Sequence, residues 1–446
     1  MKKVIAILLC MILPTLVSAE SSVVKEITMT TTQAVQLAGT LFERGDLDRA
    51  EEILTKLPPL GRNDLEIERW FLLGQISARR GDYQTAITIY RRILADQPGL
   101  ARIRFELAVC YMKTRQWYRA DYHLRLAMAG DDLPEHAKQI MNHLRFVIRQ
   151  NKNWNVWFNF GIAPDNNVNA GVGGEECVMT MFGLFCRQLP EPVKAVGYNF
   201  TLGGDYEFKL SDKWRWKSDG NIHATLYDQS QFDNLHLSAS TGPRYVWNKG
   251  DIWLAAAGGR RLHGWDGYNR SYGARLLANY DFTRKLSGGL SLRFMQNVHD
   301  EFGELLDGET YGANTRISYA IDATKYVVLR TGLDRENTKD PIYAHWRPSA
   351  SAGFGIELPA RFHLYLDASA WWQNHDGKRW VVKDNSFSQV AERNFTHRYA
   401  ASVSNNRFTV WNFAPALTFS YTKRESNIWQ REFDRFMVDF SMRQRF

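Results

Sequence analysis

The sequence predicts two successive structures, a short α-helical repeat domain and then an antiparallel transmembrane β-barrel of about 14 strands. A segment of 34 to 36 residues recurs in the first third of the chain, and long stretches after Trp154 alternate apolar with polar residues. Aromatic residues make up 13% of the 446 residues, while a mean hydropathy of −0.39 argues against a helical membrane protein. The aromatic residues are typical of the girdles of a transmembrane barrel, although a large soluble β-sheet core would also need many.

The first residues have the pattern of a secretory signal peptide. Two lysines precede an apolar stretch, 4–17, which is too short to span a bilayer. Small residues end at Ala19, so we expect cleavage between Ala19 and Glu20, with 1–19 as the signal peptide. The mature chain is therefore expected outside the cytoplasm of a Gram-negative bacterium.

The cysteines fit an oxidising compartment. Cys177 and Cys186 lie nine residues apart in a glycine-rich segment, and we expect a disulfide between them rather than the alternative of two free thiols. Cys110 lies on a helical face and is expected to be a buried small apolar residue. No Cys–His spacing resembles a metal site, so no metal is expected.

The net charge of +8 is spread along the chain with no run of five basic residues. Because an exported protein does not meet nucleic acid, we expect no nucleic-acid partner. The basic residues are more consistent with a periplasmic surface and a barrel lumen that handle anionic or acidic partners.

Residues 31–150 are predicted to form a periplasmic domain of tetratricopeptide-like repeats. Ala50, Ala86 and Ala120 recur at steps of 36 and 34 residues, each shortly after a turn such as Gly81-Asp82. Small residues allow the two helices of a repeat to cross closely, and glycine allows the turn between them. The period is that of an α-solenoid, in which each repeat packs on its neighbours.

Stacked repeats of this kind form a concave groove that commonly holds a peptide or a protein. Four polar side chains on the first helices of the repeats are expected to face the groove and bind a partner: Gln75, Arg79, Arg102 and Lys113. The alternative for each is an ordinary solvated side chain. Residues 135–150 are predicted to form one more helix, which leads into the barrel.

Residues 154–446 are predicted to form the barrel. Within 198–208, for example, aromatic and aliphatic residues alternate with polar or small ones. A soluble β-sandwich also alternates, but strands of ten to fourteen residues suit a tilted membrane crossing better. Short turns alternate with longer loops, and we expect the longer loops near 165–194, 228–233, 263–269, 298–308, 336–345, 374–392 and 424–432.

An even number of strands places both ends of the barrel, and with them the repeat domain, on the periplasmic side of the outer membrane. Near the C-terminus, Phe440, Met442 and Phe446 share one parity. Such a terminal aromatic strand resembles the signal by which the barrel assembly machinery recognises its substrates, so that machinery is an expected partner.

No catalytic site stands out. His263, His363 and His397 are isolated on polar faces or in loops, and none lies beside a recognisable nucleophile motif. The paired glycines of the barrel region have neither the spacing nor the strand-to-helix context of a phosphate loop. We therefore expect no enzymatic activity and no cofactor.

The first predicted strand and its exit, 157–169, read WFNFGIAPDNNVN. Pro164 ends strand pairing, and the Asp and Asn residues after it favour a turn through side-chain-to-backbone bonds, so a purely structural corner is one interpretation. The segment is also similar to an aromatic strand leading into a Pro-Asp-x-Asn-Ile/Val-Asn turn, with Pro164, Asp165, Asn167 and Asn169 as the motif residues. With the order of repeats and barrel, it resembles the surface lipoprotein assembly modulator (Slam) family of the type XI secretion route. The Cys177/Cys186 pair departs from that family's pattern, which leaves the role of the first loop open.

The resemblance implies an outer-membrane translocator that delivers a specific client protein from the periplasm to the cell surface or the medium. Clients in the family are surface lipoproteins that capture host iron-binding proteins, or secreted haem-binding proteins, and a periplasmic chaperone is a further partner that the resemblance allows. The main alternative is an exopolysaccharide exporter, although such exporters usually carry more repeats. A diffusion channel whose loop 165–194 folds into the pore is a weaker alternative.

Overall fold

The computed structural model describes residues 29–60, 63–130, 134–151, 153–383, 386–405 and 413–444. The predicted signal peptide with its cleavage site at Ala19 and Glu20, and the terminal Phe446, lie outside these ranges. The chain divides into two compact units, Met1–Arg69 and Trp70–Phe446, and the division falls inside the third helix. None of the described helices combines the length and the apolar character that crossing a bilayer requires.

The described residues before the barrel form helices in pairs joined by tight turns, as the repeat predicts. Residues 29–60 hold the first pair, and a third helix follows from Asn63. The helices are α1 (Thr31–Glu43), α2 (Leu47–Lys56), α3 (Asn63–Arg79), α4 (Tyr83–Asp96), α5 (Ala101–Lys113), α6 (Trp117–Ala129) and α7 (Glu135–Asn151).

The turns inside the three repeats differ in quality. Gly45 and Gly81 adopt φ of 85° and 84°, and the aspartate after each accepts a backbone hydrogen bond that caps the next helix. In the third repeat, Arg115 occupies the same position with φ 58°, and Gln116 makes no side-chain cap bond. A side chain in the left-handed region is strained, so the third turn is the least favourable of the three.

The small residues of the repeats are where helices meet. Ala50, Ala86 and Ala120 are all 0% exposed. A Cβ on Gly74 of α3 would lie only 2.5 Å from Cε1 of Tyr90 on α4, so this crossing requires glycine. The structure thereby explains why small residues recur at the repeat period.

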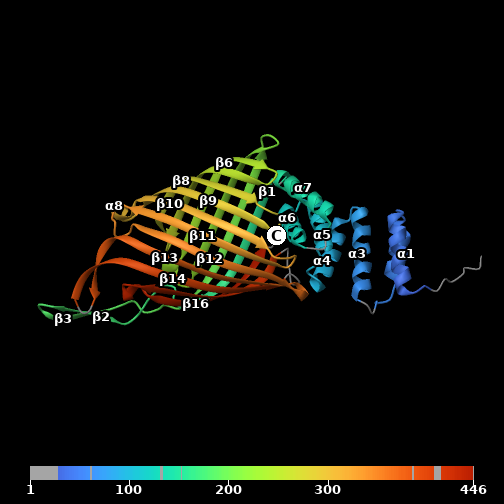
Figure 1. Cartoon of the computed structure of the whole chain (residues 1–446). Coiled ribbons are helices and arrows are strands. Elements are labelled where there is room, and N and C mark those ends of the chain that lie inside the picture. Colours follow the sequence, from blue (N-terminus) through green and yellow to red (C-terminus); the bar gives the residue numbers. More distant parts are fainter. Residues whose placement is uncertain are drawn as a thin grey trace, which may run out of the picture. The chain divides into compact units, whose positions relative to one another are not determined.

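Fourteen antiparallel strands of the described residues close into a barrel (Figure 1). Each strand pairs with its neighbours in the sequence, and β1 pairs with β16 to close the ring. The strands are β1 (Trp154–Asp165), β4 (Ala195–Lys209), β5 (Trp214–Tyr227), β6 (Asn234–Trp247), β7 (Gly250–His263), β8 (Asp266–Asp281), β9 (Leu286–His299), β10 (Gly308–Ala320), β11 (Lys325–Thr338), β12 (His345–Leu358), β13 (Phe362–Lys383), β14 (Ser386–Asn405), β15 (Phe413–Ser426) and β16 (Phe433–Gln444). The predicted strand number is confirmed.

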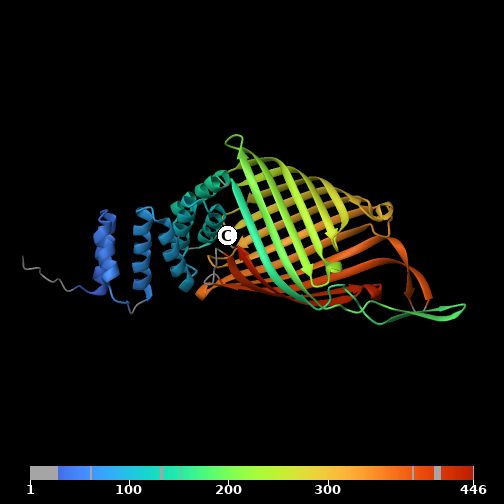
Figure 2. The same cartoon turned by 180° about the vertical axis from the view of Figure 1, so that it is seen from behind.

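The alternation along the strands separates an apolar outer wall from a polar lumen. Tyr198, Leu202 and Tyr206 of β4 are exposed on the outside, whereas Asp205 and Glu207 are buried on the inside. The green strands of this side of the wall are seen from behind in Figure 2. This pattern is that of an outer-membrane-type barrel.

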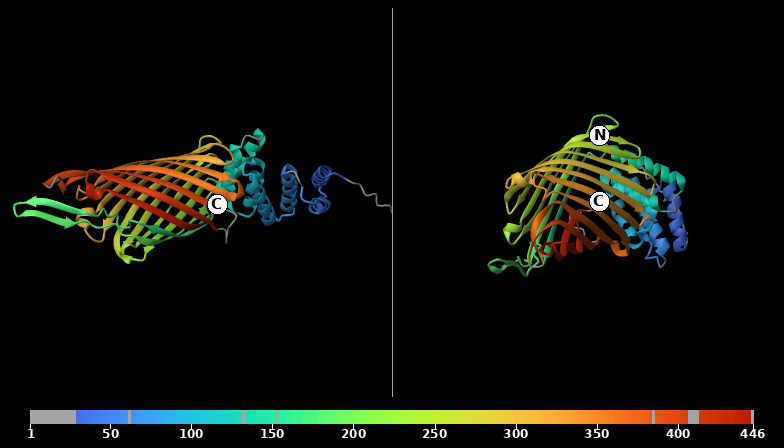
Figure 3. Two further views of the ribbon diagram at one scale, coloured as in Figure 1. Left: turned by 90° about the horizontal axis from the view of Figure 1, so that it is seen from below. Right: turned by 60° about the vertical axis from the view of Figure 1, so that its left-hand side comes forward.

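The two ends of the barrel differ. Short connections at 210–213, 248–249, 282–285, 321–324 and 359–361 form what we call the turn end, and helices α4–α7 lie at this end. The opposite end, the loop end, carries the connections at 166–194, 228–233, 264–265, 300–307, 339–344 and 427–432. Among them, a hairpin of β2 (Glu175–Thr180) and β3 (Gly183–Gln188) projects beyond the barrel wall (Figure 3).

The sequence-based expectation of long loops at 263–269 and 374–392 was wrong. Between β7 and β8 only Gly264 and Trp265 intervene, and both have positive φ, as in a two-residue hairpin turn. Residues 374–383 and 386–392 are strand rather than loop, because the ladder of β13 and β14 continues out to Lys383↔Ser386 after a register shift between Asn374 and Lys378. Strand pairing therefore runs past the length that a membrane crossing needs.

Candidate functional site

The four predicted groove residues lie on α3 and α5. Arg102 is exposed, and its guanidinium lies 4.8 Å from the centre of the Phe71 ring. Phe71 lies on α3, one helical turn before the half-buried Gln75. Arg79 and Lys113 are exposed near the ends of their helices. The structure thus brings Arg102 onto the face of α3, while it does not gather all four side chains into one cluster.

A second set of arginines faces the barrel, and the sequence analysis did not predict their role. Arg104 of α5 is 0% exposed, and its Nη2 lies 2.5 Å from Oε2 of Glu357 at the end of β12. The same guanidinium donates to the Pro98 carbonyl at 2.7 and 3.0 Å. Tyr122 of α6 donates to the other oxygen of Glu357. One barrel carboxylate therefore fastens two helices.

Helix α7 makes a second attachment at the turn end. Arg145 bridges Asp121 of α6, at 2.9 Å, and Asp281 at the end of β8, at 3.1 Å. Arg149, one turn further on, also pairs with Asp281 and donates to the Asn248 carbonyl at 2.7 Å. We call these contacts, together with those of Arg104 and Tyr122, the junction.

Two further contacts complete the junction. The hydroxyl of Tyr118 donates to Asp205 in the lumen at 2.9 Å, and Arg215 of β5 donates to the Gln150 carbonyl at 2.6 Å. Helices α5, α6 and α7 are therefore each bonded to the barrel by buried or half-buried polar groups. Such groups need their partners, because an unpaired buried charge is costly.

Burial and neighbouring charge set the titration of the junction. Burial, followed by the charge of Arg104, lowers the pKa of His123 on α6 to about 3. Burial alone would raise the pKa of Asp121, but the charges of Arg125 and Arg145 outweigh it and hold that pKa well below its usual range. His123 is thus neutral and Asp121 ionised near neutral pH.

The predicted motif at the exit of β1 forms a network across the barrel closure. Asp165 has a fully buried side chain and pairs with Arg435 of β16, whose Nε donates at 2.9 Å. Asn166 accepts from the backbone N–H of Phe436 at 2.9 Å. Asn167 donates to the carbonyl of Asp434 at 3.3 Å. Three consecutive residues at the exit of β1 thus bind three consecutive residues of β16.

The same motif also orders the first loop. Asn167 exchanges side-chain hydrogen bonds with the backbone of Gly171, at 2.8 and 2.9 Å. Asn169 donates to the carbonyl of Glu191 and accepts from the N–H of Val193, which ties the start of the loop to its end. Pro164, outward on the strand, makes none of these bonds and lies where the ladder between β1 and β16 is interrupted.

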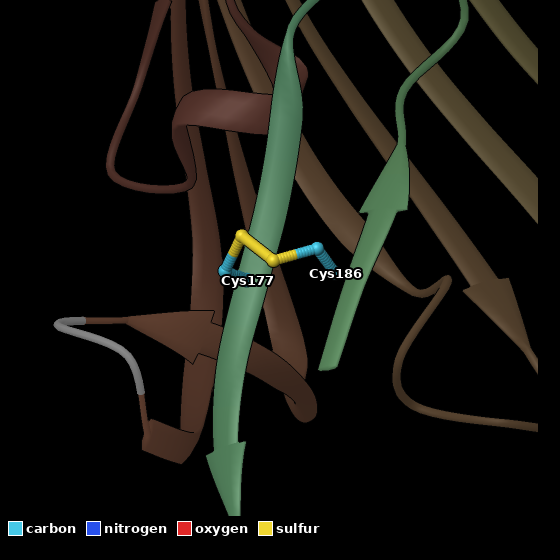
Figure 4. Close-up of a disulfide and its surroundings, with 2 residues drawn as sticks. All are labelled: Cys177 and Cys186. Carbon is cyan, nitrogen blue, oxygen red and sulfur yellow. A yellow bond between two sulfur atoms is a disulfide. The ribbon is translucent and has the colours of Figure 1, made fainter. Parts of the chain in front are cut away.

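Cys177 and Cys186 form a disulfide across the β2–β3 hairpin (Figure 4). Both sulfurs are therefore unavailable as thiolate ligands, although they lie near Glu175. Beyond the bridge the tip carries no charge, and Met181 and Phe182 are 92% and 94% exposed. The hairpin presents apolar side chains at the loop end.

Of the predicted assembly signal, Phe440 lies on the outer wall of β16 and is 51% exposed. Met442 is half-buried opposite Phe160 of β1. Recognition of this strand during assembly stays a prediction.

Comparison with known proteins agrees with this architecture. Residues 154–446, which cover the whole barrel, match the family model described as surface lipoprotein assembly modifier, and 78–141 match a tetratricopeptide repeat model. The chain belongs to the surface lipoprotein assembly modifier family. The resemblance inferred from the sequence is thereby confirmed.

Relatives in this family match different shares of the chain. A surface lipoprotein assembly modifier of Pasteurella multocida is 21% identical over 391 residues, which cover 81% of this chain and 73% of that protein. Surface lipoprotein assembly modifier 1 of Neisseria meningitidis serogroup B is 26% identical over 208 residues, or 46% of this chain and 41% of that protein.

Two solved structures are similar to this chain at low TM-scores. A loop-deletion variant of the outer-membrane protein OmpT of Vibrio cholerae aligns over 65% of this chain and 99% of its own, with 8% identity and a TM-score of 0.35. The type III secretion translocator chaperone SycD of Yersinia enterocolitica covers 27% of this chain and 87% of its own, with 20% identity and a TM-score of 0.25.

Proposed function

We propose that this protein is an outer-membrane translocator that delivers a client lipoprotein from the periplasm to the cell surface. The observation that carries the proposal is the junction, in which Arg104, Arg145 and Arg149 fasten α5–α7 to the turn end of a closed barrel. A client bound to these helices is held at the barrel, so capture and passage occur at one place. A flexibly tethered repeat domain would not provide this.

In this proposal the turn end and the helices face the periplasm, and the loop end faces the medium. Short turns on the inner side and longer loops outside are the usual arrangement of bacterial barrels. A cleaved 1–19 signal peptide and the barrel assembly machinery would bring the chain to this orientation. The disulfide of the first loop fits an oxidising compartment.

The client class follows from the relatives, which are named as modifiers of surface lipoprotein assembly. The finer proposal is a lipoprotein or secreted protein that acquires haem or iron, handed over by a periplasmic chaperone. Arg79, Arg102 and Lys113 give the helices exposed positive charge, which favours an acidic segment of the client.

The direction of transport needs a source of free energy. The sequence has no motif for a nucleotide, and no activity as an enzyme is proposed. Folding of the client outside the cell would prevent its return, because burial of its apolar residues makes the folded state favourable. The translocator then needs only to lower the barrier to passage.

The proposal is tested in an outer-membrane host that lacks relatives. The full chain is co-expressed with each exported protein encoded beside its gene, and surface exposure is measured by protease shaving and by assay of the medium. We expect one client to reach the surface only with this protein present. If every candidate stays periplasmic while the barrel is inserted, as heat-modifiable migration shows, the proposal is wrong.

The groove is tested with the client found in that assay. Arg102→Glu is expected to reduce delivery, because it reverses charge on the face shared with Phe71. Arg49→Glu on α2, whose side chain is 77% exposed, is the matched control and should deliver normally. Equal delivery by both variants would remove Arg102 from the client site.

A further inference from the structure

The closure of the barrel between β1 and β16 is the weakest ladder in the wall. β1 pairs with β4 through twelve register pairs, and β16 pairs with β15 through twelve. Over the described residues, β1 and β16 share five, from Asn159↔Arg443 to Asp165↔Met437, and the ladder skips Ala163 and Pro164. Proline has no N–H to donate, so the ladder to β16 is interrupted here and resumes at Asp165↔Met437.

Side chains replace the missing backbone pairing at the loop end. Asp165, Asn166 and Asn167 bind Arg435, Phe436 and Asp434, as described above. We call these six residues the seam latch. Near the turn end, the edge-to-face contact of Phe158 with Phe413 of β15, at 5.6 Å, crosses the same closure. Opening the barrel here therefore breaks fewer backbone pairs than opening it between β1 and β4.

The latch is coupled to the outer loops. Asn167 and Asn169 tie it to both ends of the first loop, and Glu176 at the base of the hairpin accepts from Gln430 in the connection between β15 and β16. The first loop therefore spans the closure and rests on its far side. A protein that engages the hairpin acts directly on the latch.

We propose that the barrel opens between β1 and β16 and that an extended segment of the client pairs with the freed edges. The Asp165–Arg435 ion pair is the central contact of the seam latch that must break. The inference rests on the proposed function and deepens it. Opening exposes a row of backbone N–H and C=O groups on each strand, and another β-strand satisfies such a row. An acyl chain has no donors or acceptors for them, so a polypeptide is the occupant that the chemistry favours.

The test is a reversible bridge across the closure. In a Cys110→Ala background, Gly161→Cys/Ser441→Cys places two cysteines on a register pair, where a Cβ on Gly161 would lie 2.9 Å from that of Ser441. Ile162→Cys/Phe440→Cys is a second bridge on the outer face, should the first not insert. The matched control is Ser402→Cys/Thr418→Cys, a lumen-facing pair of β14 and β15 whose hydroxyls lie 3.0 Å apart.

Delivery of the client from the surface assay is measured with and without oxidant. We expect oxidation to abolish delivery by the variant bridged between β1 and β16, and reduction to restore it. The control variant, bridged between β14 and β15, should deliver under both conditions. Delivery by an oxidised, fully bridged seam would overturn the inference and leave the proposed function intact. Loss in both variants would also overturn it, because the effect would then be general stiffening. Failure of the unmodified protein to deliver would refute the proposed function itself.

The occupant is tested by trapping. Gly161→Cys alone, in the Cys110→Ala background, is expected to form mixed disulfides with single cysteines at alternate positions of one client strand, since a paired strand presents every second residue to the same face. Ser402→Cys should trap none of them. Trapping only at the lipidated terminus of the client would show that the lipid anchor, and not a strand, lies between β1 and β16. That result would overturn the proposed strand pairing.

Discussion

Burial decides which arginines hold the helices to the barrel. Arg102 and Arg104 are two residues apart on α5, yet one is exposed over an aromatic ring and the other is 0% exposed against Glu357. Breaking a buried ion pair by removing one partner costs about 3 to 5 kcal/mol, whereas an exposed cation–π contact contributes about 0.5 to 1 kcal/mol. Two nearby arginines of one helix therefore have different roles, since Arg104 holds α5 to the barrel and Arg102 is exposed for a partner.

Arg104→Leu is expected to loosen the junction, and Arg102→Leu is its matched control. The first change leaves the Glu357 carboxylate without its cation, so the free energy of opening α5 and α6 should fall by about 3 kcal/mol or more. Native-state hydrogen exchange on the full chain measures that free energy. Equal exchange in the two variants would contradict the assigned role of Arg104.

The third repeat turn leaves room for stabilisation. Arg115→Gly removes a side chain from a residue with φ 58° and should stabilise the α5–α6 pair by about 1 kcal/mol. Gly81→Ala, at φ 84°, is the reverse control and should destabilise its own turn. Slower exchange of the α5 and α6 amides checks the first change, and unchanged exchange would show that the turn is not strained.

At the scale of elements, we expect the docking of α5–α7 to depend on pH. The folded state holds His123 neutral, with a pKa of about 3, whereas an exposed histidine has a pKa of about 6.5. The stability from this group is fully present above about pH 6.5 and is lost as the pH falls toward 3, since the opened state then binds an extra proton. Asp121, with its lowered pKa, adds a loss only at lower pH, below its ordinary value near 4.

The free energy of opening these helices should therefore fall by up to about 2 kcal/mol between pH 7 and pH 5. His123→Gln, which cannot titrate, should flatten this dependence, while His136→Gln at an exposed position of α7 should not. Hydrogen exchange at both pH values, corrected for intrinsic rates, is the measurement. The same slope in all three proteins would contradict the buried role of His123.

We expect the order of the β2–β3 hairpin to depend on the disulfide. A bridge that closes a loop this short contributes about 2 to 3 kcal/mol. Cys177→Ser/Cys186→Ser should make the apolar tip a faster site of chymotrypsin cleavage while heat-modifiable migration of the barrel stays unchanged. Cleavage at the original rate would show that packing on β13 and β14, and not the bridge, orders the hairpin.

The elements were predictable to different degrees. Helical and strand periods gave the repeats and the barrel, because each depends on local alternation. The loop expected at 374–392 was wrong since the pairing of β13 and β14 continues beyond the register shift at Asn374, and polar residues such as those after it do not by themselves end a strand. The two-residue turn at Gly264 and Trp265 was missed because the segment is polar on both sides.

At the scale of the whole molecule, the junction and the seam latch could not be read from the sequence. Arg104 and Glu357 are 253 residues apart, and Asp165 and Arg435 are 270 apart, so no local spacing links them. The motif at the exit of β1 was visible as a sequence pattern, but its partners appear only when the barrel closes. Arg145 and Arg149, one turn apart on one helix, were the available signal for a docking face.

These distant contacts together describe one molecule in which helices, barrel and outer loops are mechanically connected. Helices α5–α7 are bonded to the turn end of the barrel, and the residues at the exit of β1 are bonded to β16 at the loop end. We expect a client to pass from one to the other, with its own folding outside supplying the direction.

Reconstitution with purified components tests this claim most directly. The full chain is inserted into liposomes, the purified client is added outside in an unfolded, chaperone-bound form, and protected client is measured after protease treatment. We predict protected, folded client only in vesicles that contain the protein with its helices outward, and less with Arg104→Leu. Vesicles with correctly folded, outward-facing protein and no protected client would contradict the account.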